Sequence, residues 1–250
     1  VREIMRNLPH ERIVYFGDTA RVPYGSKSKS TVLRYSRQIV RFLETQNVKA
    51  IVAACNTASA LALDTIEKEV QLPILGVVKP GATVAVHTTR NKRVGVIATE
   101  STIHSHLYRT LIQAEDPEIT VFGKACPLFV PLVEEGWTKD SITREVAGRY
   151  LGELLEKDID TLIMGCTHYP LLRSLLREIV GEKVTLVNPA YETAQALKRM
   201  LSDMNLENQA PGGEPYRFYT SDAAEKFDAF AASILPCRVP AAEQIPIEEY

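Results

Sequence analysis

Two stretches of this chain follow one pattern, and each of them leads to a cysteine. The first covers residues 47–57 (NVKAIVAACNT) and the second covers residues 158–168 (DIDTLIMGCTH). In both, a strand-like apolar run ends in a small residue, the cysteine and then polar residues, and a helical pattern follows. The duplication predicts two similar lobes that face each other across an active-site cleft, one contributing Cys55 and the other Cys166.

Strand patterns and helical patterns alternate along most of the chain. Residues 50–54 are apolar at every position, which is typical of a strand covered by helices on both faces. Residues 28–45 repeat apolar side chains at helical spacing, and residues 58–70 are expected to form the next helix. This alternation predicts an α/β fold with two pseudo-symmetric lobes, each a mainly parallel sheet flanked by helices. Residues 205–215, rich in Gly and Pro, are expected to form a loop.

The internal symmetry also suggests how the lobes are divided along the chain. We expect residues 1–80 and 189–250 to form a first, discontinuous lobe and residues 81–188 to form a second, with a break in the chain at Pro80. The second half opens with the strand pattern of residues 93–98, which has no counterpart in the first half. The first lobe is therefore expected to lack its N-terminal strand and the turn after it.

Composition argues against several classes of partner and compartment. The formal net charge is −2, so the chain has no basic field that would attract nucleic acid or an anionic membrane. No apolar run reaches the roughly 18 residues needed to span a bilayer, and the first ten residues lack the apolar core of a signal peptide. Four cysteines without a tight framework or metal-ligand spacing predict reduced thiols in a cytoplasmic protein, without a metal site.

The two cysteines of the repeat are each expected between a strand end and a helix start. Inverting a tetrahedral carbon needs a base on one face and an acid on the other, and a thiolate opposite a thiol can exchange these roles. A free thiol has a pKa of about 8.5, and the N-terminus of a helix lowers it. The polar residues that follow the cysteines, Asn56, Thr57 and Thr167, add donors that suit a substrate carboxylate.

A catalytic thiol also needs an acid or base partner. His168 could serve Cys166 in this way, and Glu134 is a second candidate on the same lobe, with Glu135 left open as its alternative. Each residue also has a plain structural interpretation, in which His168 bonds a backbone group and Glu134 is a solvated loop charge. Cysteines are usually buried and inert, and we interpret the two that lie outside the repeat in this way.

Longer motifs surround these residues. They are GDTARVPYG (residues 17–25), ACNTAS (54–59), GVIAT (95–99), VPLVEEG (130–136) and GCTHYPLL (165–172). In these motifs and in their order, the chain resembles the glutamate racemases of the aspartate/glutamate racemase superfamily from end to end. His168 after Cys-Thr favours the glutamate branch, because aspartate racemases resemble this pattern with an acidic residue at that position.

The resemblance implies cofactor-independent interconversion of L- and D-glutamate by two thiols. It implies that the catalytic residues are Cys55, Cys166, His168 and Glu134. It implies that the substrate is bound by Tyr24, Gly25, Asn56, Thr57, Thr167 and His168. It also implies a bacterial cytoplasmic homodimer that supplies D-glutamate for peptidoglycan, with small-molecule glutamate as its partner. The family opens with an Asp-Ser-Gly turn whose Asp assists one cysteine, and this turn belongs to the segment that the symmetry argument finds missing.

Three alternatives stay open at this point. The chain could be an aspartate or hydantoin-type racemase, although Thr167-His168 disfavours this. It could be a thiol redox or hydrolytic enzyme that uses only one of its cysteines. It could also be a catalytically impaired binding protein, because a missing sheet strand exposes its neighbours' backbone groups and apolar surface.

Overall fold

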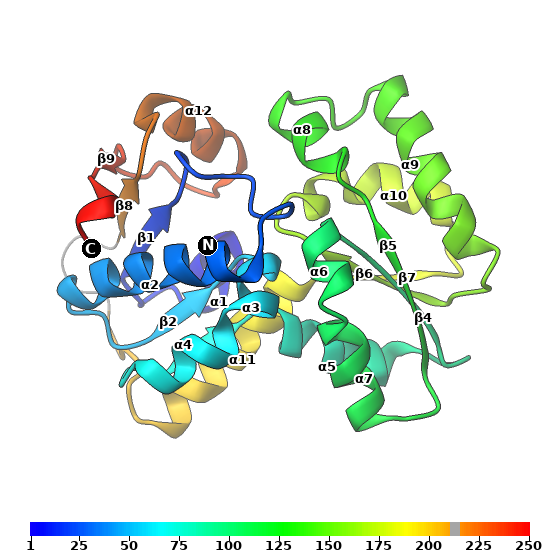
Figure 1. Ribbon diagram of the computed structural model, residues 1–250, viewed down its shortest axis with the longest axis horizontal. Coiled ribbons are helices and arrows are strands. Elements are labelled where there is room, and N and C mark those ends of the chain that lie inside the picture. The colour runs from blue at the N-terminus through cyan, green and yellow to red at the C-terminus, as the bar shows by residue number, and fades with distance from the viewer. Residues whose placement is uncertain (211–215) are drawn as a thin grey trace.

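The structure is a computed structural model that describes residues 1–210 and 216–250 (Figure 1). Its strands form three sheets, and every strand pairing is parallel. The sheet orders are β1-β8-β9, β2-β3 and β5-β4-β6-β7. The strands are β1 (Ile13–Gly17), β2 (Ile51–Ala53), β3 (Ile74–Gly76), β4 (Arg93–Ala98), β5 (Thr120–Ala125), β6 (Thr161–Gly165), β7 (Thr185–Val187), β8 (Tyr216–Thr220) and β9 (Glu243–Gln244).

Helices surround the three sheets and confirm the predicted α/β class. They are α1 (Arg2–Asn7), α2 (Lys29–Thr45), α3 (Asn56–Leu61), α4 (Leu63–Glu69), α5 (Val78–Thr88), α6 (Glu100–His104), α7 (Leu107–Glu115), α8 (Phe129–Glu134), α9 (Ser141–Leu155), α10 (Arg173–Val180), α11 (Pro189–Asp203) and α12 (Ala224–Ile234), with short 3₁₀ helices at Tyr169–Leu172 and Ile247–Glu249. Within the described residues, none of these helices has the length and apolar character needed to cross a membrane.

The four-stranded sheet is covered by helices on both faces, as the mostly apolar and buried residues of its central strands β4 and β6 require. All five residues of β6 are buried. Leu162 and Met164 belong to the apolar cluster that includes α8, α9 and α10, whereas Ile163 between them packs with α5 and α7. Because successive strand residues point to opposite faces, one apolar strand supplies the core on both sides of the sheet.

We call β4–β7 with α5–α10 the second half, and the rest of the described chain the first half. Figure 1 shows them as two groups of elements beside each other. In the second half, β4 lies between β5 and β6 and pairs with both. In the first half, no described strand lies between β1 and β2, so their sheets stay separate. The division of lobes at residues 80/81 and 188/189 stays a prediction.

Two sequence predictions about helices were wrong. Helix α5 begins at Val78 and continues through Pro80, where a break was expected. In the first turn of a helix the backbone N–H has no intrahelical partner, so proline is tolerated there. The single helix expected over residues 58–70 is divided at Ala62, where α3 ends and α4 begins. The expected loop is free of helix and strand over residues 205–210, and its remaining residues 211–215 lie outside the described part of the chain.

The ends of three strands bring the functional candidates together. Parallel strands present their carboxyl ends along one edge of a sheet. Thr99 follows β4 and Cys166 follows β6, and these strands are neighbours whose last residues, Ala98 and Gly165, are paired. Cys55 follows β2 in the first half. Figure 1 shows α3 and α6, the helices that begin after Cys55 and Thr99, close together between the two halves, and the two helices are in contact.

Replacing Gly165 by alanine is expected to destabilise the fold by about 1–3 kcal/mol, because an added Cβ overpacks this site. That Cβ would lie 2.9 Å from the carbonyl oxygen of Ile97 and 3.1 Å from Cβ of Ala98, and a backbone carbonyl in a sheet cannot move aside. Urea denaturation followed by circular dichroism measures the change. Gly148→Ala is the matched control, since a Cβ there meets no atom within 4 Å and alanine is preferred in a helix. A Gly165 variant as stable as the wild type would contradict this packing argument.

Candidate active site

Cys55 caps the first turn of helix α3. Its Sγ accepts a hydrogen bond from the backbone N–H of Ala58 at 3.5 Å, and its side chain is partly exposed. Burial raises the pKa of the Cys55 thiol from its ordinary value, while the N–H of Ala58 and the N–H and hydroxyl of Thr57 act in the opposite direction. The helix start that the sequence predicted is therefore present. Its hydrogen-bond donors favour the thiolate of Cys55, but the cost of burying the thiolate is larger, so the pKa of the thiol is raised overall.

Cys166 directly follows β6 and is only 8% exposed. Burial raises the pKa of its thiol to about 12, against the opposing hydrogen bonds from His168 N–H and from the hydroxyl and N–H of Thr167. A charge on Cys55 raises the pKa of Cys166 further. Cys55 follows β2 in the first half and Cys166 follows β6 in the second, so the charge of a thiol on one half affects the thiol on the other.

His168 connects Cys166 to a carboxylate on helix α8. Its Nδ1 lies 3.8 Å from the Sγ of Cys166, and its Nε2 lies 3.2 Å from Oε1 of Glu134. Burial lowers the pKa of His168, and Glu134 partly opposes this shift. Because an ionised carboxylate only accepts hydrogen bonds, the proton of the neutral imidazole belongs on Nε2, which leaves Nδ1 as an acceptor facing the thiol.

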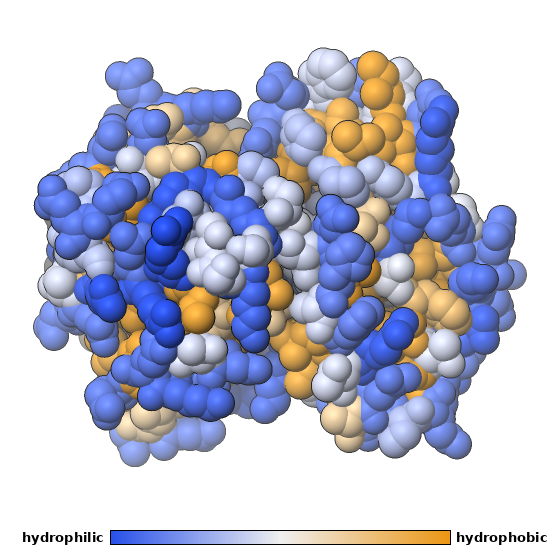
Figure 2. Space-filling view, in the orientation of Figure 1, coloured by the Kyte–Doolittle hydropathy of each residue, from blue (hydrophilic) through white to orange (hydrophobic). Residues whose placement is uncertain are grey.

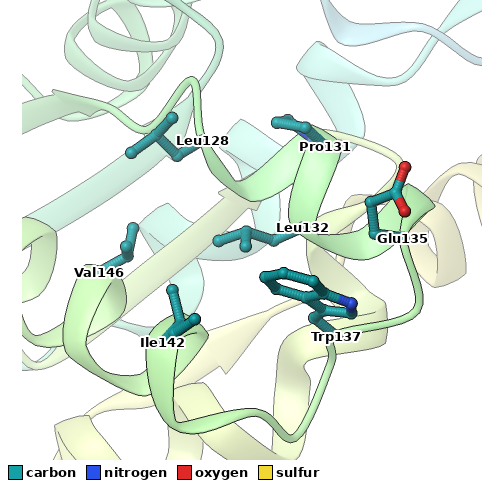
Figure 3. Close-up of a pocket in the computed structure, with 7 residues that line it drawn as sticks. All are labelled: Leu128, Pro131, Leu132, Glu135, Trp137, Ile142 and Val146. Carbon is teal, nitrogen blue, oxygen red and sulfur yellow. The ribbon is translucent and has the colours of Figure 1, made fainter.

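The neighbouring Glu135 points elsewhere. It lines a hollow of about 260 Å³ between α8 and α9 whose other walls are apolar (Figure 3). Apolar side chains gather on the outer surface over these helices (Figure 2), and Leu128, Trp137 and Ile142 are 50%, 45% and 50% exposed there. Between the two glutamates that the sequence left open, Glu134 is the one that the structure places beside His168.

The polar residues after Cys55 hydrogen-bond to the second half. The Oδ1 of Asn56 accepts a hydrogen bond of 2.7 Å from the hydroxyl of Tyr108 on α7. The Oγ1 of Thr57 lies 2.9 Å from that of Thr99 and 3.2 Å from that of Thr102. Asn56 and Thr57 are 5% and 1% exposed, so these contacts join the two halves through a buried polar seam.

Tyr24 and Gly25 lie in the loop between β1 and α2. The hydroxyl of Tyr24 donates to Oδ2 of Asp18. The carbonyl of Gly25 accepts a hydrogen bond of 3.0 Å from the N–H of Ser101 in the second half. A Cβ on Gly25 would lie 2.6 Å from Cβ of Thr99, which explains why glycine is needed at this close approach.

Asp18 anchors this loop, a role that the sequence analysis did not assign. The single N–H of Arg21 Nε is shared between the two oxygens of the Asp18 carboxylate, at 2.8 and 2.9 Å. The carboxylate also accepts a hydrogen bond from Tyr24 and one of 2.9 Å from the hydroxyl of Ser221. Arg21 also lies over the ring of Tyr35, 4.1 Å from its centroid. Asp18 directly follows a strand, as Cys166 does, and this position is the signal that could have identified it.

The remaining cysteines differ from the pair in the site. Cys126 is fully buried in the core of the second half, and burial raises the pKa of its thiol. Cys237 is exposed. Within residues 1–210 and 216–250, no group of three or more His, Cys, Asp or Glu side chains is arranged to hold a metal ion.

The known proteins that match this chain in sequence and in structure include several glutamate racemases. The chain is 46% identical over 227 residues to the glutamate racemase of Geobacter metallireducens, covering 91% of this chain and 84% of that protein. It is 44% identical to the glutamate racemase of Syntrophus aciditrophicus, covering 99% and 92% of the two chains. The structure matches that of glutamate racemase RacE1 from Bacillus anthracis with a TM-score of 0.94 and 35% identity, covering 98% and 92% of the two chains.

A second solved structure is that of glutamate racemase from Francisella tularensis in complex with D-glutamate. It matches with a TM-score of 0.92 and 36% identity, covering all of this chain and 93% of that one. The family model described as Asp/Glu/Hydantoin racemase matches residues 1–197. The family model and the relatives agree in sequence and fold over most of the chain and lead to a single assignment: the chain belongs to the Asp/Glu/hydantoin racemase family.

Proposed function

We propose that this protein interconverts L- and D-glutamate by proton transfer at Cα between two thiols, without a cofactor. The observation that carries the proposal is that Cys55 and Cys166 each follow a strand, β2 of the first half and β6 of the second. Glutamate as substrate is supported by relatives named glutamate racemase and by the similar structure that was solved with D-glutamate. Aspartate and hydantoins are less favoured.

In the proposed reaction one thiolate removes the proton of Cα, and the opposite thiol donates its own proton to the other face of the same carbon. The C–H bond on the first face breaks, a C–H bond on the second face forms, and the thiolate and thiol exchange places. Burial of both sulfurs makes each thiolate a strong base, because the pKa of each thiol is raised.

His168 and Glu134 are proposed to control the protonation of Cys166. With its proton held on Nε2 by Glu134, the imidazole offers the lone pair of Nδ1 to the thiol. The lowered pKa of His168 keeps this lone pair available near neutral pH. Asn56, Thr57, Thr167, His168 and the backbone of Tyr24 and Gly25 are proposed to bind the carboxylates and ammonium group of the substrate.

The proposed setting is a bacterial cytoplasm in which the enzyme works as a homodimer and supplies D-glutamate for peptidoglycan. This follows the family resemblance of the sequence motifs. The lobes proposed from residues 1–80 with 189–250 and from residues 81–188 would close on the substrate and exclude water. Exclusion of water strengthens the stabilisation of the carbanion-like transition state by nearby donors.

Deuterium exchange tests the proposed function. The purified chain is incubated with L-glutamate in D₂O, and loss of the α-proton signal in NMR is followed together with optical inversion by circular dichroism. We expect deuterium to enter Cα while D-glutamate forms, because the proton that arrives comes from a solvent-exchanged thiol. A folded sample that neither exchanges nor inverts glutamate would disprove the proposal.

Parallel incubations with L-aspartate and a substituted hydantoin separate the related activities. We expect turnover of glutamate to exceed that of both. Faster inversion of aspartate or of the hydantoin would assign the chain to that branch of the family instead.

A further inference from the structure

One buried tyrosine of the second half contacts a sequence neighbour of each cysteine. Tyr108 on α7 is 4% exposed, and its hydroxyl donates a hydrogen bond of 2.7 Å to Oδ1 of Asn56, the residue after Cys55. Its ring lies against Gly165, the residue before Cys166, where an added Cβ would come within 3.2 Å of Cε2 of the ring. A single side chain therefore joins the start of α3 in the first half to the end of β6 in the second.

The hydrogen bond to Tyr108 decides which end of the Asn56 amide is left for a ligand. A side-chain amide has an oxygen that accepts hydrogen bonds and a nitrogen that donates them. Burial raises the pKa of Tyr108, so its phenol keeps its proton and acts as the donor to the amide oxygen. The nitrogen Nδ2, on the other branch of the amide, keeps both of its N–H groups for another partner.

This nitrogen is open to solvent although Asn56 as a whole is buried. Asn56 is 5% exposed, and its Nδ2 donates to no residue within the described ranges 1–210 and 216–250. In those ranges the fully enclosed side-chain polar atoms without a hydrogen-bond partner are Nη2 of Arg21 and Oγ1 of Thr220. Nδ2 of Asn56 is therefore accessible, at the start of the helix that Cys55 caps, and its N–H groups suit an acceptor such as a carboxylate.

We propose that Tyr108 is a positioning residue, which holds the Asn56 amide in the orientation that presents its N–H groups to a substrate carboxylate. The inference rests on the proposed function, in which Asn56 binds glutamate. Tyr108 acts through Asn56 and does not itself contact the substrate. Because the phenol belongs to one half and the amide to the other, the orientation of Asn56 depends on the contact between the halves.

Replacing Tyr108 by phenylalanine removes the hydroxyl and keeps the ring that packs against Gly165. Without its donor, the Asn56 amide can turn its oxygen toward the substrate, and an oxygen acceptor repels a carboxylate. We expect Kd for glutamate to rise about tenfold in Tyr108→Phe, the low end of what a hydrogen bond to a charged group contributes. Isothermal titration calorimetry of the full chain with racemic glutamate measures this change, because a racemic ligand keeps its composition during any turnover.

Kinetic constants and a double variant separate positioning from a merely structural role. A contact with the carboxylate is made in the ground state and in the transition state alike, so KM should rise with Kd while kcat stays within about twofold. In Asn56→Ala the phenol has no amide to orient, so adding Tyr108→Phe to that variant should not raise Kd further. Asn56→Asp keeps an acceptor for Tyr108 but replaces the donor by a negative charge, and it should abolish measurable binding.

Tyr219→Phe on β8 is the matched control. Tyr219 is 8% exposed, and its hydroxyl also donates to a side-chain amide oxygen, Oε1 of Gln46, at 3.3 Å. This variant should leave Kd and KM for glutamate unchanged.

Three results would overturn the proposal. They are a wild-type Kd in a folded Tyr108→Phe variant, an equal rise in Tyr219→Phe, and a further tenfold rise when Tyr108→Phe is added to Asn56→Ala. If Tyr108→Phe does not fold, binding of glutamate by Asn56→Asp with the wild-type Kd would overturn it instead.

The calorimetric assay needs no turnover, so the two proposals fail separately. A chain that racemises glutamate while Tyr108→Phe binds it as the wild type does contradicts only the positioning role. A chain that binds glutamate and shows the tenfold loss in Tyr108→Phe, but does not racemise it, contradicts only the proposed function. A wild-type chain that does not bind glutamate contradicts both.

Discussion

Replacing either Cys55 or Cys166 by alanine is expected to lower kcat for glutamate racemisation by about 10⁴-fold in both directions, at the upper end of what one acid–base group contributes. Each direction needs one sulfur as the base and the other as the acid, so neither direction survives the loss of one thiol. Circular dichroism started from L-glutamate and from D-glutamate measures both rates. Cys237→Ala, which removes an exposed cysteine, should retain the wild-type rates.

The same two variants separate a two-base mechanism from a one-base mechanism. A single remaining thiol can still remove and return a proton on its own face of the carbon. In D₂O each variant is therefore expected to exchange the α-proton of one enantiomer without inverting it, and the two variants should act on opposite enantiomers. Inversion at the wild-type rate in either alanine variant would rule out the two-thiol mechanism and would favour an enzyme that uses one cysteine.

Much of the fold follows from apolar periodicity. The residues of β6 are all buried because helices cover both faces of its sheet, and apolar runs such as residues 50–54 and 162–164 were enough to predict an α/β fold with parallel sheets. Pro80 shows where local rules fail, because the same residue that breaks the interior of a helix is compatible with its first turn. Whether Pro80 breaks a helix or is accommodated in one depends on where the helix begins, and α5 begins at Val78, so Pro80 lies in its first turn.

The site could be predicted only in part, for a related reason. The duplicated strand ends identified Cys55 and Cys166, and adjacency in sequence then pointed to His168. The hydrogen bonds of Thr57 with Thr99 and Thr102 could not be found in this way, because they depend on which helix starts meet between the halves. The choice between two adjacent glutamates likewise depended on the direction in which α8 turns its side chains.

Asp18→Ala is expected to lower the free energy of unfolding by about 3–5 kcal/mol, the cost of leaving one member of a buried ion pair without its partner. The side chains of Arg21 and Asp18 are 10% and 6% exposed, and Nε of Arg21 lies 2.8 Å from the carboxylate. Tyr24 and Ser221 lose an acceptor in the same variant. Urea denaturation followed by circular dichroism measures the loss.

An exposed ion pair of the same type provides the control. Arg37 and Glu69 are joined at 2.6 Å, but their side chains are 39% and 40% exposed. Water and salt screen such a pair, so Glu69→Ala should be indistinguishable from the wild type. In the double variant Asp18→Ala/Arg21→Ala no buried charge is left unpaired, so its loss should be smaller than the sum of the two single losses. If Asp18→Ala and Glu69→Ala lowered the free energy of unfolding equally, this would contradict the argument that burial makes the Asp18–Arg21 pair stabilising.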